Sequence, residues 1–273
     1  MTPTAATPAA PKFPANIGLT TPAKRGSSVR LAQYVLNKHN RLGQDFLKGP
    51  VDGVYGPLSV AATKSAKYWI GYPSDKINGI YGPGLHAYLL PIGSRGAKPL
   101  PNAYKLRRAQ RLALAKKERE IVTRRKKAAD IAVRQIGTVE RPAGSNKVKY
   151  SDWYGMRGPW CAMFVSWCFN EAGIKFRYAY CPYVEADAKA GKNGLRLVGS
   201  KYATKGDLAL FGFGKGEAVH IGFVVRNLGG GWYETVEGNT SAGDGGSQAN
   251  GGGVFKRRRH ISQIRCFVRL ENA

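Results

Sequence analysis

The chain has 273 residues, of which 43% are hydrophobic and 11% aromatic. It is longer than an average domain, so we expect two modules joined by a linker. This composition supplies enough apolar surface for real cores and excludes wholesale disorder. The formal net charge is +26, from 43 Lys and Arg against 17 Asp and Glu.

A charge of this size bears on the partners of the protein and not on its fold. Nucleic acid, an anionic lipid surface and the phosphate-bearing polymers of a bacterial wall would all attract it. We find no zinc-finger spacing, RNP-like aromatic motif or basic leucine zipper, so we expect no specific nucleic-acid binding.

The four cysteines form no C-x-x-C pair, which argues against a structural zinc site. A chain of this length does not need disulfides for stability, and we expect free thiols in a reducing cytoplasm, although a disulfide between some pair stays open. We therefore predict no structural zinc site, and the cysteine-based reaction described below requires no cofactor. The four residues are Cys161, Cys168, Cys181 and Cys266.

The N-terminal sequence lacks a basic segment followed by an apolar one, so it does not indicate a secretory signal. Its Pro, Ala and Thr content predicts a disordered tail over residues 1–27. Nowhere does a long uncharged apolar run predict a transmembrane helix. We therefore expect the protein to accumulate in the cytoplasm of the cell that makes it.

Residues 28–91 contain a small internal repeat, with VDGVYGP beginning at Val51 and INGIYGP at Ile77. Each copy has an Asp-Gly or Asn-Gly turn, then an aromatic residue, then Gly-Pro at the start of a helix. Helical spacing before the first copy adds another helix, so we predict an all-α unit of three helices. Tyr55 and Tyr81 should lie at the edge of its core.

This repeat resembles the PGBD-like peptidoglycan-binding domain, whose mark is D-G-x-[FY]-G before a helix in each of two half-repeats. Both copies keep the pattern, with Asn78 in place of Asp in the second. The resemblance implies that residues 28–91 bind peptidoglycan. An unrelated small helical bundle is the alternative.

Residues 92–123 should form a linker followed by a basic helix. The segment 91–103 is rich in Pro and Gly, and the residues after it are strong helix formers with no Gly or Pro before Gly137. The dense Lys and Arg residues favour a solvated helical spacer with nonspecific attraction to anionic wall polymers or a membrane surface. A dedicated electrostatic binding element is the alternative.

The catalytic residues are expected in residues 124–273. GPWCAMFVSWCFNEAG predicts a helix, with Pro159 just before it and Gly173 where a C-terminal cap belongs. Cys161 lies in the first turn, where unpaired backbone N–H groups and the helix dipole favour a thiolate. Cys168 lies two turns later on the apolar stripe and should be inert.

Short β-branched or aromatic runs at 207–213, 218–225, 232–238 and 264–270 predict strands. A cysteine nucleophile needs a nearby base, and the base needs an orienting acceptor. His220 can take the thiol proton, and Glu237 or Asn239 on the following strand can accept from its second ring nitrogen. A helix carrying the cysteine on an antiparallel sheet carrying the histidine is a papain-like α+β layout.

The remaining charged run, KRRRH ending at His260, is expected as a solvated turn or a wall-facing patch. Cys181 and Cys266 are expected in the core.

The motifs PWCAMFVSWC, GDLALF, VHIGFVV and VEGNTS resemble, in this order, a CHAP domain of the amidase type found in phage endolysins. The resemblance implies that Cys161 is the nucleophile and His220 the base, assisted by Glu237 and Asn239. Some relatives have Gln before the cysteine to help form the oxyanion hole, whereas this chain has Trp160. Some also carry an acidic calcium-binding loop, which is not found here, so no metal is predicted.

Together the two resemblances imply a monomeric phage endolysin. It would hydrolyse an amide bond of peptidoglycan, as an N-acetylmuramoyl-L-alanine amidase or an endopeptidase, after release from the cytoplasm through a partner pore. Two alternatives remain open. One is a virion-associated structural lysin used for entry, and the other is a non-enzymatic basic protein that binds wall or nucleic acid.

Overall fold

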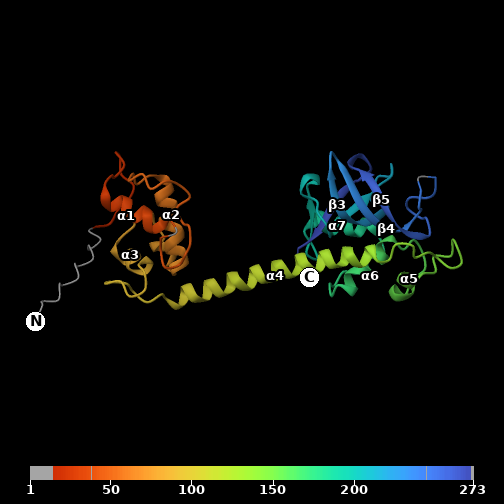
Figure 1. Ribbon diagram of the computed structural model, residues 1–273, viewed down its shortest axis with the longest axis horizontal. Helices are drawn as coiled ribbons and strands as arrows, with labels where there is room; N and C mark the ends of the chain where they lie inside the picture. Colours follow the sequence, from red (N-terminus) through yellow and green to blue (C-terminus); the bar gives the residue numbers. More distant parts are fainter. Residues whose placement is uncertain (1–14, 38, 244, 272–273) are drawn as a thin grey trace, which may run out of the picture. The chain divides into compact units, whose positions relative to one another are not determined.

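The computed structural model describes residues 15–37, 39–243 and 245–271. The chain divides into two compact units, up to Ala113 and from Leu114 onward (Figure 1). The boundary falls inside α4 (Asn102–Val133). Each unit has its own hydrophobic core, so each is described by itself.

The first unit contains α1 (Ser27–Leu36), α2 (Pro57–Ile70), the 3-10 turn η1 (Ser74–Lys76) and α3 (Pro83–Leu89). Both copies of the sequence repeat form the same turn. The side-chain oxygen of Asp52 accepts from the Val54 amide at 2.9 Å, and that of Asn78 accepts from the Ile80 amide at 3.2 Å. A proline then occupies the first turn of α2 and of α3.

Tyr55 and Tyr81 lie inside this core and not at its edge, because neither ring is exposed to solvent. The Tyr55 hydroxyl donates to the Gly79 carbonyl at 2.8 Å, and the Tyr81 hydroxyl contacts His86 Nδ1 at 2.9 Å. Each aromatic therefore has a buried polar partner for its hydroxyl, which allows full burial.

The prediction of a disordered tail over residues 1–27 is wrong for residues 15–27, which the structure describes. Ile17 exchanges two backbone hydrogen bonds with Tyr81, at 2.7 and 2.8 Å, and is buried. Arg25 forms a further antiparallel bridge to Val54. Residues 15–27 therefore belong to the folded unit, whereas residues 1–14 lie outside the described residues.

The basic stretch forms the long helix α4, whose side chains at residues 108–114 and 116–120 are exposed. Near its start, the guanidinium of Arg107 lies 4.3 Å from the centre of the Tyr68 ring on α2. Near its end, Arg125 donates to the buried carboxylate of Asp207 at 2.8 Å. No helix in the described part of the chain is long and apolar enough to cross a membrane.

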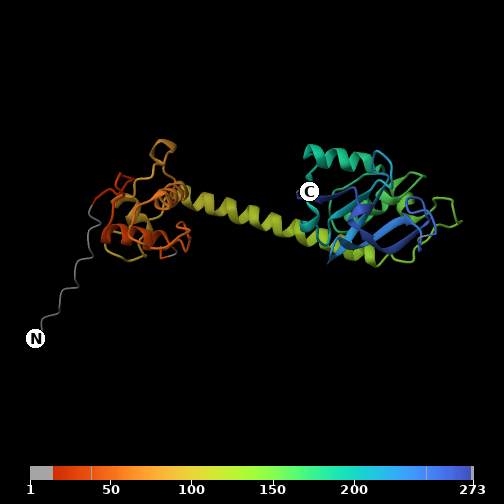
Figure 2. The ribbon, with the colours of Figure 1, turned by 90° about the horizontal axis from the view of Figure 1, so that it is seen from above.

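The second unit packs helices on an antiparallel sheet (Figures 1 and 2). The sheet has six strands in the order β1-β6-β2-β3-β4-β5. The helices are α5 (Lys149–Tyr154), α6 (Cys161–Glu171) and α7 (Cys181–Ala190). The strands are β1 (Leu195–Val198), β2 (Leu208–Phe211), β3 (His220–Gly229), β4 (Trp232–Thr240), β5 (Gly253–His260) and β6 (Cys266–Leu270), with the 3-10 turns η2 (Ser200–Tyr202) and η3 (Ile261–Gln263). This mixed helix and antiparallel sheet is consistent with a papain-like layout.

The helix α6 packs directly on β3 and β4. The ring of Phe169 on α6 lies 5.0 Å from that of Phe223 on β3, measured between centres. On β4, a Cβ atom added to Gly238 would come within 2.7 Å of the Phe164 ring. Because glycine has no side chain, the strand can approach the helix this closely.

The charge of the KRRRH segment predicts a solvated turn or a wall-facing patch. The prediction of a turn is wrong, because the segment is a strand. It forms most of β5, which pairs with β4 along its whole length. Alternate residues of a strand point to opposite faces. Lys256 and Arg258 are therefore exposed, while Arg257 and Arg259 turn inward and are buried.

Candidate active site

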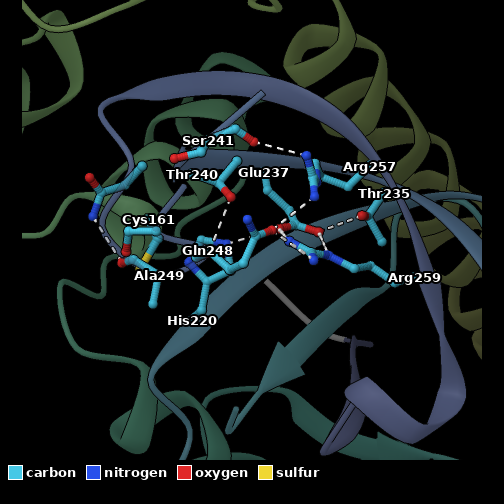
Figure 3. Close-up of polar contacts among 12 residues, drawn as sticks. Cys161, His220, Thr235, Glu237, Thr240, Ser241, Gln248, Ala249, Arg257 and Arg259 are labelled. Carbon is cyan, nitrogen blue, oxygen red and sulfur yellow. Dashed lines mark hydrogen bonds and ion pairs between the residues drawn. The ribbon is translucent and has the colours of Figure 1, made fainter. Parts of the chain in front are cut away.

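Cys161 is the first residue of α6 and His220 is the first residue of β3. The packing of α6 on the sheet brings the two side chains together in the interior (Figure 3). Burial matters here because a charge pair in a low-dielectric site interacts far more strongly than one in water.

His220 is oriented by Glu237 on the neighbouring strand β4. Its Nε2 lies 3.0 Å from Glu237 Oε2, and both side chains are fully buried. Its Nδ1 makes no direct hydrogen bond within the described part of the chain. Nδ1 is therefore the ring nitrogen available to exchange a proton with the sulfur of Cys161.

Arg259 on β5 holds the Glu237 carboxylate by both oxygens (Figure 3). Its Nε donates to Oε1 at 2.9 Å and its Nη2 donates to Oε2 at 2.6 Å. The hydroxyl of Thr235 also donates to Oε1, at 2.6 Å. A bidentate Arg–carboxylate pair has one preferred geometry, so Arg259 sets the position from which Glu237 contacts His220.

The charges of this group reinforce one another. Burial raises the pKa of Glu237, but its hydrogen bonds and charge interactions with Arg259 and His220 outweigh burial and lower the pKa to about 2. Burial lowers the pKa of His220, yet Cys161 and Glu237 raise it to about 9. At neutral pH the site therefore holds a carboxylate next to an imidazolium.

The sulfur of Cys161 is stabilised as a thiolate. The Cys181 thiol, whose sulfur lies 3.6 Å away, is the largest cause of a Cys161 pKa well below its usual value. His220 and the Ala162 amide lower the pKa of Cys161 further and together outweigh its burial. By contrast, burial raises the pKa of the Cys168 thiol well above its usual value, in agreement with its predicted inertness.

The hydrogen bond that orients His220 comes from Glu237 and not from Asn239, whose Oδ1 makes no hydrogen bond within the described part of the chain. Asn239 has a left-handed φ of 60° at the end of β4. Its Nδ2 donates to the carbonyl of Ala249 and to Asn250 Oδ1, both at 3.3 Å. It therefore connects β4 to the loop that precedes β5.

Trp160 occupies the position before the nucleophile and is fully buried. Its Nε1 donates to Glu140 Oε1 at 2.7 Å, and its ring stacks on Tyr150. The first backbone hydrogen bond of α6 runs from the Phe164 amide to the Trp160 carbonyl, so the Cys161 amide has no acceptor within the helix. This amide stays a candidate donor to an oxyanion.

A cavity of about 570 Å³ lies one residue away from this group. Its lining residue Glu140 bonds Trp160 and its lining residue Asn250 bonds Asn239, while Cys161 and His220 are not among the residues that line it. Ser241, Gly252 and Phe255 also line it. Among the described residues, no group of three or more His, Cys, Asp and Glu side chains could hold a metal ion.

Sequence reasoning missed Arg259 and Cys181. The only signal for Arg259 was its place in an alternating run that could also be read as solvated charge. Cys181 had one signal, the Cys-Pro pair at 181–182, since Pro favours the first turn of a helix. Neither signal indicates that the residue faces the nucleophile.

A thiolate beside an imidazolium that is held by a carboxylate is the arrangement that cysteine-dependent acyl transfer requires. In agreement, residues 153–239 match the model of the CHAP domain family. The match contains Cys161, His220 and Glu237, and β5 with Arg259 lies beyond it. A search of curated proteins found no match.

A CHAP domain implies peptidoglycan hydrolase activity in general, as an amidase or peptidase that depends on cysteine and histidine.

We expect iodoacetamide to alkylate Cys161 at pH 7 nearly as fast as at pH 9, because only the thiolate reacts and the pKa of Cys161 is lowered. The rate should fall only when the pH drops below that lowered pKa. Mass spectrometry of the peptide that contains Cys161 measures it, with the buried Cys168 as an unreactive internal control. A midpoint near that of a free thiol, about 8.5, would contradict the assignment.

Proposed function

We propose that the protein is a phage endolysin, a peptidoglycan hydrolase that cleaves an amide bond of the bacterial wall. The observation that carries the proposal is the buried chain from Cys161 through His220 to Glu237 and Arg259. The CHAP match supplies the substrate class.

In the first half of the reaction, the Cys161 thiolate attacks the carbonyl carbon of the scissile amide. The developing oxyanion can accept from the Cys161 amide at the start of α6. The His220 imidazolium then gives its Nδ1 proton to the departing amine, the C–N bond breaks, and a thioester remains on Cys161.

In the second half, neutral His220 takes a proton from water, and the resulting hydroxide attacks the thioester carbon. The C–S bond breaks, the carboxylic product leaves, and the thiolate–imidazolium pair returns. Glu237 keeps the imidazole ring in one orientation throughout, since it bonds Nε2 and leaves Nδ1 for the sulfur.

The cavity beside Trp160 and Asn239 is large enough for part of a stem peptide. The backbone of its glycine-rich lining is paired within the fold, because the Gly251 amide donates to the Asn239 carbonyl and the Gly252 carbonyl accepts from the Glu140 amide, both at 2.9 Å. The size of the cavity is compatible with either bond, the muramoyl–L-alanine amide or a bond within the stem or cross-bridge.

The first unit is proposed to bind peptidoglycan. Two repeated turns, each with an Asx side chain bonded to the amide two residues later and each followed by a helix, support its resemblance to PGBD-like domains. The exposed basic side chains of α4 would add attraction to anionic wall polymers. We further propose synthesis in the host cytoplasm and action on the wall after release.

Purified peptidoglycan digested by the full chain should release fragments that Cys161→Ala does not release. Loss of the sulfur should lower the rate by roughly 10³-fold or more, because no nucleophile remains. Mass spectrometry of the fragments identifies the bond that is cut. Cys266→Ala, at a half-buried position on β6, is the matched control and should keep its rate. A Cys161→Ala variant that digests the wall at full rate would contradict the proposal.

Residues 15–113 should stay bound to purified peptidoglycan, stripped of anionic polymers, in about 1 M salt, where charges are screened beyond roughly 3 Å. A peptide of residues 102–133 carries the basic charge alone and should be released under the same conditions. Cosedimentation measures both. If the two lose binding together as salt rises, the first unit attracts the wall only by charge.

A further inference from the structure

Two cysteine sulfurs meet at the active site, and the reaction proposed above uses only one of them. Sγ of Cys161 lies 3.6 Å from Sγ of Cys181, and both residues are free and buried. Each begins a helix, Cys161 at α6 and Cys181 at α7. The hydrogen bonds of the described residues bring no other pair of cysteine sulfurs together.

The separation is short enough for covalent chemistry between the two sulfurs. A disulfide has an S–S length near 2.05 Å, so the two sulfurs need to approach by about 1.5 Å for the bond to form. Both helix N-termini carry partial positive charge that favours a thiolate. The pKa of Cys161 is lowered, whereas the Cys161 sulfur and burial raise the pKa of Cys181 well above its usual value. Cys161 is therefore the sulfur that reacts first, and Cys181 has to lose its proton before it can react.

We propose that oxidation joins Cys161 and Cys181 in a disulfide, which stores the enzyme in an inactive form until a thiol reduces it. The oxidant is a hydroperoxide. The Cys161 thiolate attacks one peroxide oxygen, the O–O bond breaks, and one water leaves after protonation, which gives a sulfenic acid on Cys161.

The Cys181 sulfur, once it has lost its proton, then attacks the sulfur of this sulfenic acid. The S–S bond forms, the S–O bond breaks, and the departing hydroxide takes a proton and leaves as water. In sum, two thiols are oxidised and one hydrogen peroxide is reduced to two waters. A dithiol reverses the result by thiol–disulfide exchange.

The disulfide removes the nucleophile, because the sulfur of Cys161 is then bonded to a second sulfur and cannot attack a carbonyl carbon. This control of activity rests on the proposed hydrolase function, whereas the formation of the disulfide does not. Without Cys181, the sulfenic acid on Cys161 has no neighbouring thiol and is open to further oxidation to sulfinic acid, which dithiothreitol does not reverse.

The test treats the reduced full chain with a small excess of hydrogen peroxide, stops the reaction with catalase, and maps peptides without reduction. We expect a Cys161–Cys181 cross-link and a loss of peptidoglycan hydrolysis on the order of tenfold or more, since the thiolate is consumed. Dithiothreitol should restore the activity. Cys168→Ala, which removes a buried thiol elsewhere on α6, should behave like the wild type.

Cys181→Ala should form no cross-link, and its activity, measured relative to its own reduced form, should stay lost after dithiothreitol. The proposal is overturned if the wild type lacks the cross-link, or if Cys181→Ala recovers as fully as the wild type. A reduced wild type without hydrolase activity would instead refute the proposed function, because the peptide map reports the disulfide by itself.

Discussion

The bidentate pair between Arg259 and Glu237 is the interaction on which the active site depends. A carboxylate buried without a partner would take up a proton, since desolvation penalises its charge. Arg259 keeps the Glu237 carboxylate ionised, and Cys161 together with Glu237 raises the pKa of His220 to about 9. The imidazolium then helps to lower the pKa of Cys161. The charge of the Cys161 sulfur thus depends first on the Cys181 thiol and then on His220, which is held in turn by Glu237 on β4 and Arg259 on β5.

This dependence explains why the site spans most of the second unit. The sulfur comes from a helix, the base from β3, the carboxylate from β4 and the guanidinium from β5. A chain of buried charges is stabilising only when every member has its partner, and removal of one leaves another unpaired. The close approach of β4 to α6 at Gly238 keeps these elements in contact.

Local pattern is enough to predict those parts of the site that local chemistry determines. The apolar spacing after Cys161 predicts α6, and alternation around His220 predicts its strand, because helix and strand periods differ. Arg259 could not be predicted, since a charged run is usually solvated and its partner Glu237 lies 22 positions earlier in the chain. The same holds for Cys181, whose contact with Cys161 arises only when α7, packed on β1 and β6, brings its first residue to the start of α6. Asn239 shows the opposite case, since its place at the end of the strand after His220 suggests a hydrogen bond to the histidine, whereas its Nδ2 donates to Ala249 and Asn250 in the loop before β5.

The protonation state of His220 tests this account most directly. Nitrogen NMR of the full chain, with each ring assigned by His→Gln variants of the other histidines, reports both ring nitrogens. The account predicts that Nδ1 and Nε2 of His220 are both protonated at pH 7 and that the ring loses its proton only near pH 9. A neutral His220 ring at pH 7, titrating near the ordinary value of about 6.5, would contradict the thiolate–imidazolium pair.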